Sequence, residues 1–131
     1  MRSSVYELDV YETMSGKKPF RDFLHTLHKE GKVTEVAQIK AYLDRLRQHG
    51  MGINNYYPKT IRKVSDKDKG IWELRPGGNR VFFFHFTKNK IVLLHGYQKH
   101  SQKAPPSEIR QAENEMKDYL RREANEHEPH L

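Results

Sequence analysis

The sequence predicts an α+β domain in which helices pack on an antiparallel sheet. Between residues 19 and 49 the apolar residues recur at intervals of three and four, which is typical of amphipathic helices. Between residues 60 and 97 they form short β-branched and aromatic runs separated by turn residues, which is typical of a strand meander. With an early strand and a last helix, the expected order is β-α-α-β-β-β-α, with a two-helix hairpin and a C-terminal helix on the sheet.

The length and composition favour one domain with one core. The chain has 131 residues, of which 35% are hydrophobic and 31% charged, and its 6 Phe, 7 Tyr and 1 Trp can bury large areas. We therefore expect a single domain over residues 1–131, with a polar tail from about residue 123. The absence of cysteine excludes disulfides and thiolate metal sites and fits a cytoplasmic location. No run of about 20 apolar residues exists, so we expect no membrane partner.

The elements before the meander follow from two different periodicities. Apolar and acidic residues alternate from Val5 to Tyr11, which predicts a strand. Pro19 suits the first turn of a short helix that Gly31 ends. A second helix should run from residue 33 to His49-Gly50, where glycine favours a C-terminal stop. Residues 51–58 are expected to form a loop.

Four apolar segments, separated by Gly-, Asn- and Pro-containing turns, form the predicted meander of three or four antiparallel strands. They are residues 60–64, 71–75, 81–86 and 91–97. The runs VFFFHF and IVLLHGY are almost continuously apolar, as expected for central strands covered on both faces or for strands with one aromatic face towards a ligand. Pro105-Pro106 ends the sheet, and Ser107 can cap a helix that continues to Arg122.

The positive charge is concentrated in the meander. The net charge is +7, and the segment from Tyr57 to Lys103 holds 11 of the 24 Lys and Arg residues but 3 of the 17 Asp and Glu residues. An excess of this kind on one part of a domain indicates an anionic partner.

Two arginines are expected to meet at one end of the sheet. Strand alternation places Glu73 and Arg75 on the same face, and a hairpin closed by residues 76–79 brings Arg75 close to Arg80. Two guanidinium groups repel each other unless an anion or a carboxylate lies between them. Arginine forks match phosphate oxygens, so a phosphate is one candidate for that anion.

The segment after the last strand should add to this basic concavity. It carries Lys99, His100 and Lys103, preceded by Tyr97, and an aromatic or imidazole ring can stack on a base or move a proton. Together these residues suit an RNA backbone.

Simpler interpretations of the same residues are also open. Arg75 and Arg80 can be exposed strand residues paired with Glu73 or Asp66, since surface ion pairs are common. His85 and His95 lie in apolar runs and are expected to be core or half-buried residues rather than catalytic ones. Helical metal-binding motifs and carboxylate clusters are missing from the sequence, so we expect no metal and no cofactor.

The run IWELRPGGNRVFFFHFTKNKIVLLHGYQKHSQKAPPSEIRQAENEMKDYL resembles the C-terminal half of the RelE/HigB-like toxins of bacterial type II toxin-antitoxin systems, in particular their phage-derived Gp49-like branch. The resemblance rests on a Trp-Glu-Leu-Arg strand, an arginine that opens an aromatic strand, the IVLLHG strand and the lysine-rich QKHSQKAP segment before a helix. It implies the RelE/ParE-like toxin fold.

The resemblance also implies an activity, that of a ribosome-dependent endoribonuclease that cuts messenger RNA without a metal and inhibits translation and growth. By position in the motif, Arg75, Arg80 and Lys99 correspond to cations that brace the scissile phosphate. Some relatives carry a tyrosine where this chain has Lys103-Ala104-Pro105-Pro106, which leaves His100, Tyr97, Lys99 or Lys103 for proton transfer. His100 ranks first because an imidazole titrates near neutral pH. The candidate catalytic residues are Arg75, Arg80, Lys99 and His100, and the candidate RNA-binding residues are Lys103, Tyr97, Arg62 and Lys63.

The resemblance implies partners too, namely the ribosome, messenger RNA and a cognate antitoxin that is often a helix-turn-helix protein. An alternative function is that of a ParE-like toxin that poisons a protein such as gyrase without cutting RNA. A third is an inactive phage or plasmid remnant.

Overall fold

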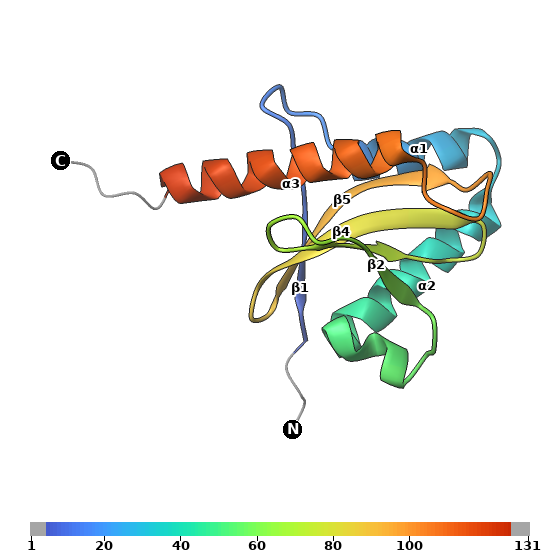
Figure 1. Cartoon of the computed structure of the whole chain (residues 1–131). Coiled ribbons are helices and arrows are strands. Elements are labelled where there is room, and N and C mark those ends of the chain that lie inside the picture. The colour runs from blue at the N-terminus through green and yellow to red at the C-terminus, as the bar shows by residue number, and fades with distance from the viewer. Residues whose placement is uncertain (1–4, 127–131) are drawn as a thin grey trace.

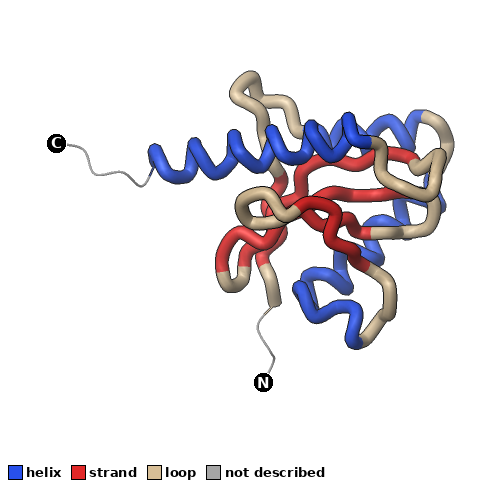
Figure 2. The backbone as a smooth tube through the Cα atoms, viewed as in Figure 1, coloured by secondary structure: helices blue, strands red, loops and turns tan. Residues whose placement is uncertain are grey.

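Strands that are apolar on both faces need cover on both sides, and the helices of this protein supply it. In the computed structural model, which describes residues 5–126, α1 (Pro19–Lys29) and α2 (Val33–His49) cover one face of a five-stranded sheet (Figure 1). Helix α3 (Pro106–Glu126) covers the other face and extends beyond the sheet towards the C-terminus (Figure 2). The α+β class, the two-helix hairpin and the C-terminal helix predicted from the sequence are confirmed.

The sheet is mixed, although most of its strand pairs are antiparallel. All four segments predicted between residues 60 and 97 form strands, so the order contains one strand more than β-α-α-β-β-β-α. Strand β1 pairs with β5 in parallel, which corrects the expectation of a purely antiparallel sheet. The strand order is β1-β5-β4-β3-β2, and the bounds are β1 (Glu7–Val10), β2 (Ile61–Ser65), β3 (Ile71–Leu74), β4 (Asn79–Thr87) and β5 (Lys90–Gln98).

Strand β4 divides its aromatic residues between two cores. Val81 and Phe83 pack with the α1 and α2 residues Leu27, Ile39 and Leu46. Phe82 and Phe84 point to the opposite face and pack with Ala112 and Met116 of α3. Alternation of side chains along the strand therefore explains why a continuous apolar run is needed here.

Several predicted boundaries shift by a few residues. The predicted loop 51–58 contains the 3-10 helix η1 (Gly50–Asn55). Gly50 ends α2 as predicted, with φ 58° and a backbone so close to Tyr6 that a Cβ atom would lie 2.1 Å from its Cζ atom. Helix α3 includes residues 123–126 of the expected polar tail, and residues 127–131 lie outside the described part of the chain. None of the described helices is both long enough and apolar enough to span a membrane.

Candidate functional site

The buried carboxylate of Glu73 joins three arginines at one end of the sheet. Its side chain is 1% exposed, and its Oε2 atom lies 3.0 Å from an Nη atom of Arg62, 3.7 Å from Nε of Arg75 and 3.9 Å from Nε of Arg80. The Arg62 contact includes a hydrogen bond from Nε at 3.2 Å. We call Arg62, Glu73, Arg75 and Arg80 the arginine cluster.

Strand register and alternation build this cluster. Arg62 lies directly opposite Glu73 in the β2–β3 pair. Arg75 follows Glu73 by two residues and therefore has the same facing. Arg80 comes from β4, at the end of the hairpin that begins with Pro76. The predicted meeting of Arg75 and Arg80 is confirmed. Both also pair with Glu73, but the alternative of exposed residues in surface ion pairs is wrong, because Arg80 is 7% exposed and Glu73 is 1% exposed.

The guanidinium of Arg80 is held in one orientation by the turn before it. Its Nη1 donates hydrogen bonds to the carbonyl oxygens of Gly77 and Asn79, both at 2.8 Å, and its side chain is 7% exposed. Burial lowers the pKa of Arg80, and the charge of Glu73 acts against that change. A guanidinium keeps its charge throughout the physiological range, so the group is a fixed cation.

The arginine cluster carries a net positive charge and contains buried polar atoms that have no hydrogen-bond partner among the described residues. Three guanidinium groups surround one carboxylate, which leaves a formal excess of two positive charges. Oε1 of Glu73 and Nε of Arg75 are buried and have no hydrogen-bond partner among the described residues. Buried polar atoms of this kind are rare in proteins. Guanidinium groups pair with phosphate oxygens, so the excess positive charge of the cluster suits a phosphate.

Tyr97 lies beside the arginine cluster and supplies a hydroxyl group. It is directly opposite Arg80 in the β4–β5 pair, is half-buried, and its ring centroid is 5.5 Å from that of Phe82. Burial raises the pKa of Tyr97, the charge of Glu73 raises it further, and Arg80 acts in the opposite direction. The phenol is therefore protonated at neutral pH and can donate a proton or a hydrogen bond.

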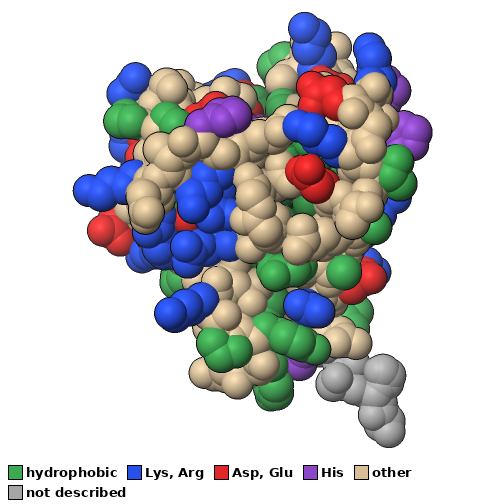
Figure 3. Space-filling model, turned by 90° about the vertical axis from the view of Figure 1, so that its right-hand side faces the viewer, with side chains coloured by type: hydrophobic (Ala, Val, Ile, Leu, Met, Phe, Trp, Pro, Cys, Tyr) green, Lys and Arg blue, Asp and Glu red, His purple; other side chains and the backbone are tan. Residues whose placement is uncertain are grey.

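The segment after β5 passes next to the turn that holds Arg80. The amide of Lys99 donates to the carbonyl of Gly78 at 2.8 Å. The side chains of His100 and Lys103 are exposed, and no contact joins them to the arginine cluster in the described structure. The view in Figure 3 shows a large patch of Lys and Arg side chains on this face of the molecule.

One sequence-predicted RNA-binding residue lies elsewhere. Lys63 is opposite Trp72 in the β2–β3 pair, so its side chain points to the face covered by α1 and α2, away from Glu73. Its Nζ atom pairs with Asp66 at 3.0 Å. The structure thus groups Arg62 with the other arginines and separates Lys63 from them, because neighbouring residues in a strand face opposite sides.

A second polar cluster lies under the first turns of α3. The imidazole of His95 is buried, with Nδ1 at 2.7 Å from Glu115 and Nε2 at 2.9 Å from Glu108. Each ring nitrogen faces a carboxylate oxygen, an arrangement that favours the imidazolium form, with hydrogen on both nitrogens. His85 is half-buried. Both histidines therefore have the core or half-buried positions expected from the sequence.

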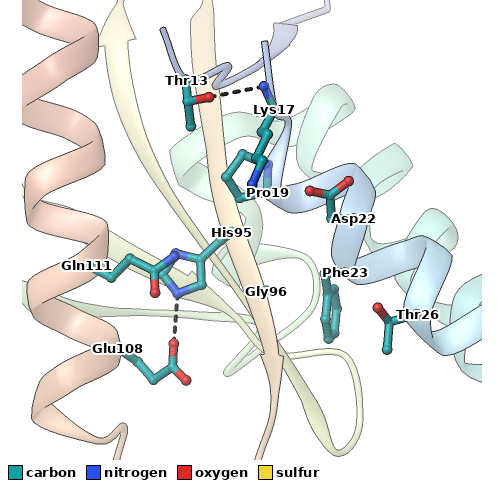
Figure 4. Close-up of a pocket in the computed structure, with 10 residues that line it drawn as sticks. All are labelled: Thr13, Lys17, Pro19, Asp22, Phe23, Thr26, His95, Gly96, Glu108 and Gln111. Carbon is teal, nitrogen blue, oxygen red and sulfur yellow. Dashed lines mark hydrogen bonds and ion pairs between the residues drawn. The ribbon is translucent and has the colours of Figure 1, made fainter. Parts of the chain in front are cut away.

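His95 also lines a hollow of about 420 Å³ between α1 and α3, next to Gly96 of β5 (Figure 4). Phe23 and Asp22 line it from α1, and Glu108 and Gln111 line it from α3. None of its lining residues belongs to the arginine cluster. The hollow and the arginine cluster are therefore separate features.

We expect the His95 cluster to make stability depend on pH. Burial acts against the charged ring, but the hydrogen bonds and charges of Glu115 and Glu108 outweigh it and raise the pKa of His95. A raised folded-state pKa adds stability that is fully present below the unfolded value of about 6.5 and is lost as the pH rises through the folded value. In urea unfolding from pH 6 to 9, the gap in unfolding free energy between the wild type and His95→Gln should shrink with rising pH.

His25→Gln is the control, because His25 is exposed on α1. Its unfolding free energy should follow the wild type across the same range. A wild-type advantage over His95→Gln that grew with pH would contradict the assignment.

Sequence reasoning did not identify two parts of this arrangement. Glu73 was considered only as a surface partner, although its register opposite Arg62 makes it the centre of the cluster. The pairing of His95 with Glu108 and Glu115 was not considered. The spacing of Glu108 and Glu115, two helical turns apart on one face of α3, was the available signal.

Comparison with known protein families identifies a relationship for most of the chain. Residues 22–117, which are most of the chain, match the family model described as phage derived protein Gp49-like (DUF891). Among curated proteins, none matches this chain. The matched range includes the whole arginine cluster, Tyr97 and the His95 cluster.

Proposed function

Because this chain belongs to the phage-derived Gp49-like family, we propose that it is the toxin of a type II toxin-antitoxin system and cuts messenger RNA on the ribosome. Three arginines, from β2, from the residue after β3 and from β4, surround one partly unsatisfied carboxylate, and this observation carries the proposal. The resemblance of residues 71–120 to RelE/HigB-like toxins supports it further.

The proposed reaction uses the RNA's own nucleophile. The ribose 2′-oxygen attacks the adjacent phosphorus, the bond to the 5′-oxygen breaks, and the products end in a 2′,3′-cyclic phosphate and a 5′-hydroxyl. Arg75 and Arg80 stabilise the extra negative charge that the phosphate gains in the transition state. Lys99 adds a third cation from the segment beside Gly78.

Proton transfer needs one group that accepts and one that donates. Tyr97 is protonated at neutral pH and lies opposite Arg80, so we assign it the proton given to the departing 5′-oxygen. His100 follows three residues later and is our candidate for accepting the 2′-hydroxyl proton. Arg62 and Lys103 are proposed to bind flanking phosphates.

The proposed partners are the ribosome, messenger RNA and a small helix-turn-helix antitoxin. An antitoxin that covers the arginine cluster needs acidic side chains there, so its association should weaken with salt. The wild-type protein, expressed without an antitoxin, should arrest growth and leave internal cuts in translated messages.

Product chemistry tests the proposal most directly. Messages cut in a translation reaction with purified protein should carry 2′,3′-cyclic phosphate and 5′-hydroxyl ends, and a single 2′-deoxy nucleotide at the cut site should block cleavage. Ends with 5′-phosphate would contradict the proposed mechanism, because a metal-activated water produces them.

A second function is favoured by one observation. Glu73 already shares its charge with all three arginines, as expected if the cluster binds a partner without cutting RNA. A ParE-like toxin that poisons gyrase would fit this arrangement. Intact messages together with broken DNA during growth arrest would identify it.

A further inference from the structure

A group of aromatic rings lies exposed at the end of α2 and in the loop before β2. Tyr56 is 66% exposed and Tyr57 is 39% exposed. The ring of Tyr56 stacks on that of His49, with centroids 4.0 Å apart and an interplanar angle of 22°. The guanidinium carbon of Arg45 lies 4.3 Å from the Tyr57 ring centroid. We call these four side chains the aromatic platform.

The backbone of the platform is held in place. The side chain of Asn54 accepts hydrogen bonds from the amides of Thr60 and Ile61 and donates to the carbonyl of Ile61. The hydroxyl of Thr60 donates to the carbonyl of Tyr57 at 2.6 Å. Exposed aromatic side chains on a fixed loop lose little entropy when they bind a ligand, which favours a binding role over a packing role.

The loop that carries Tyr56 and Tyr57 leads directly into β2, the strand that holds Arg62. The carbonyl of Thr60 accepts a hydrogen bond from the amide of Arg75 at 3.0 Å, and Arg62 follows two residues later on β2. Tyr57 and Thr60 are three positions apart in the sequence, a span of roughly 10 Å at most. Hydrophobic side chains lie next to the Lys and Arg patch on the face in Figure 3, below it in that view.

The charge around the platform suits an anionic polymer. No acidic residue occurs between Arg45 and Lys63 in the sequence. Arg47, Lys59 and Arg62 are all exposed in this stretch, although Arg47 pairs with Asp44 and Arg62 with Glu73. Flat π surfaces combined with positive charge are the arrangement that binds single-stranded nucleic acid, where bases stack and phosphates meet cations.

We propose that the aromatic platform binds an unpaired base of the same RNA strand whose phosphate occupies the arginine cluster. This inference rests on the proposed function. The outer face of Tyr56 stacks on the base, because its other face is covered by His49. Every base can stack on an aromatic ring. The platform therefore positions the RNA strand and adds affinity without selecting a sequence.

The experiment measures binding of a fluorescein-labelled RNA decamer whose 2′-hydroxyls are methylated, so that it cannot be cut. Fluorescence anisotropy at low salt gives Kd for the wild type and for Tyr56→Ala, Tyr57→Ala and Arg75→Ala. Met14→Ala is the matched control, since Met14 is 75% exposed on the connection between β1 and α1. Each tyrosine variant should bind about 5-fold to 100-fold more weakly, and the control should match the wild type.

Two further readouts separate stacking from general loss of structure. The slope of log Kd against log salt should be unchanged in Tyr56→Ala and lower by about 0.7 in Arg75→Ala, because a phosphate contact is lost only in the second. Removing single bases from the decamer should weaken wild-type binding at one position. Tyr56→Ala should bind the abasic decamer and the intact decamer equally well, because this variant has no Tyr56 ring on which the base could stack.

The outcomes are distinguishable. If Arg75→Ala weakens binding and both tyrosine variants match the control, the platform proposal is wrong while the proposed function stands. If Arg75→Ala and the tyrosine variants all bind as the wild type does, the proposed RNA site fails as well.

Discussion

Replacement of Arg80 by alanine should lower the rate of messenger RNA cleavage about 10²-fold to 10³-fold, the cost of removing one preorganised group that stabilises developing negative charge. The side chain is 7% exposed and its Nη1 is fixed by two carbonyl oxygens, so no reorganisation is needed when the phosphate gains charge. The rate is measured in a translation reaction with purified variant, and growth inhibition should weaken in parallel.

Two further variants define what Arg80 contributes. Arg80→Lys keeps the charge but not the planar fork, so it should recover only part of the rate. Arg21→Ala removes an exposed arginine from α1 and should leave cleavage unchanged. Full cleavage by a folded Arg80→Ala protein, with folding checked by urea unfolding, would show that the arginine cluster is not the active site.

Replacement of Glu73 by glutamine should lower the free energy of unfolding by about 3 kcal/mol, the lower part of the range for breaking a buried ion pair from one side. Glu73 is 1% exposed and is the shared partner of three arginines, which then repel one another without a counter-charge. The lower part of the range applies because Arg62 and Arg75 reach solvent, with 45% and 29% of their side chains exposed. Urea denaturation gives the value.

Asp44→Asn is the matched control for this change. Asp44 also pairs with an arginine, Arg47, at 3.0 Å, but its side chain is 72% exposed. An exposed pair of this type contributes at most about 1 kcal/mol. Equal losses of unfolding free energy in Glu73→Gln and Asp44→Asn would mean that burial does not make the Glu73 ion pairs more stabilising than an exposed pair. Higher salt should narrow the difference between Glu73→Gln and the wild type, because screening weakens repulsion among the arginines.

Local sequence patterns were sufficient to predict most of the fold. The 3.6-residue period of α1 and α2, the turn residues between the strands and the glycine after His49 each act over a few neighbouring residues. The parallel pairing of β1 with β5 was not predicted, since it joins segments separated by about 80 residues along the chain. No local pattern distinguishes a parallel neighbour from an antiparallel one when the strand has four residues.

Part of the candidate site was also predictable from local sequence patterns. Arg75 and Arg80 flank one hairpin, so alternation alone brings them together. The position of Arg62 depends on the register of β2 against β3, and a shift of one residue would have selected Lys63 in its place. The aromatic platform depends on η1, where a loop was expected, and on the hydrogen bonds of Asn54.

The sequence by itself determined which residues form helices and strands, where the positive charge lies along the chain and which two arginines meet. Those properties depend on interactions between near neighbours. The tertiary structure alone decided that a buried carboxylate lies among three arginines, that His95 is bound by two glutamates of α3 and that Thr60, at the end of the loop with the exposed tyrosines, is hydrogen-bonded to the backbone of Arg75. Each of these features depends on how segments far apart in the sequence pack together. A shift of one residue in strand register, or of a few ångströms between packed elements, would give a side chain a different partner.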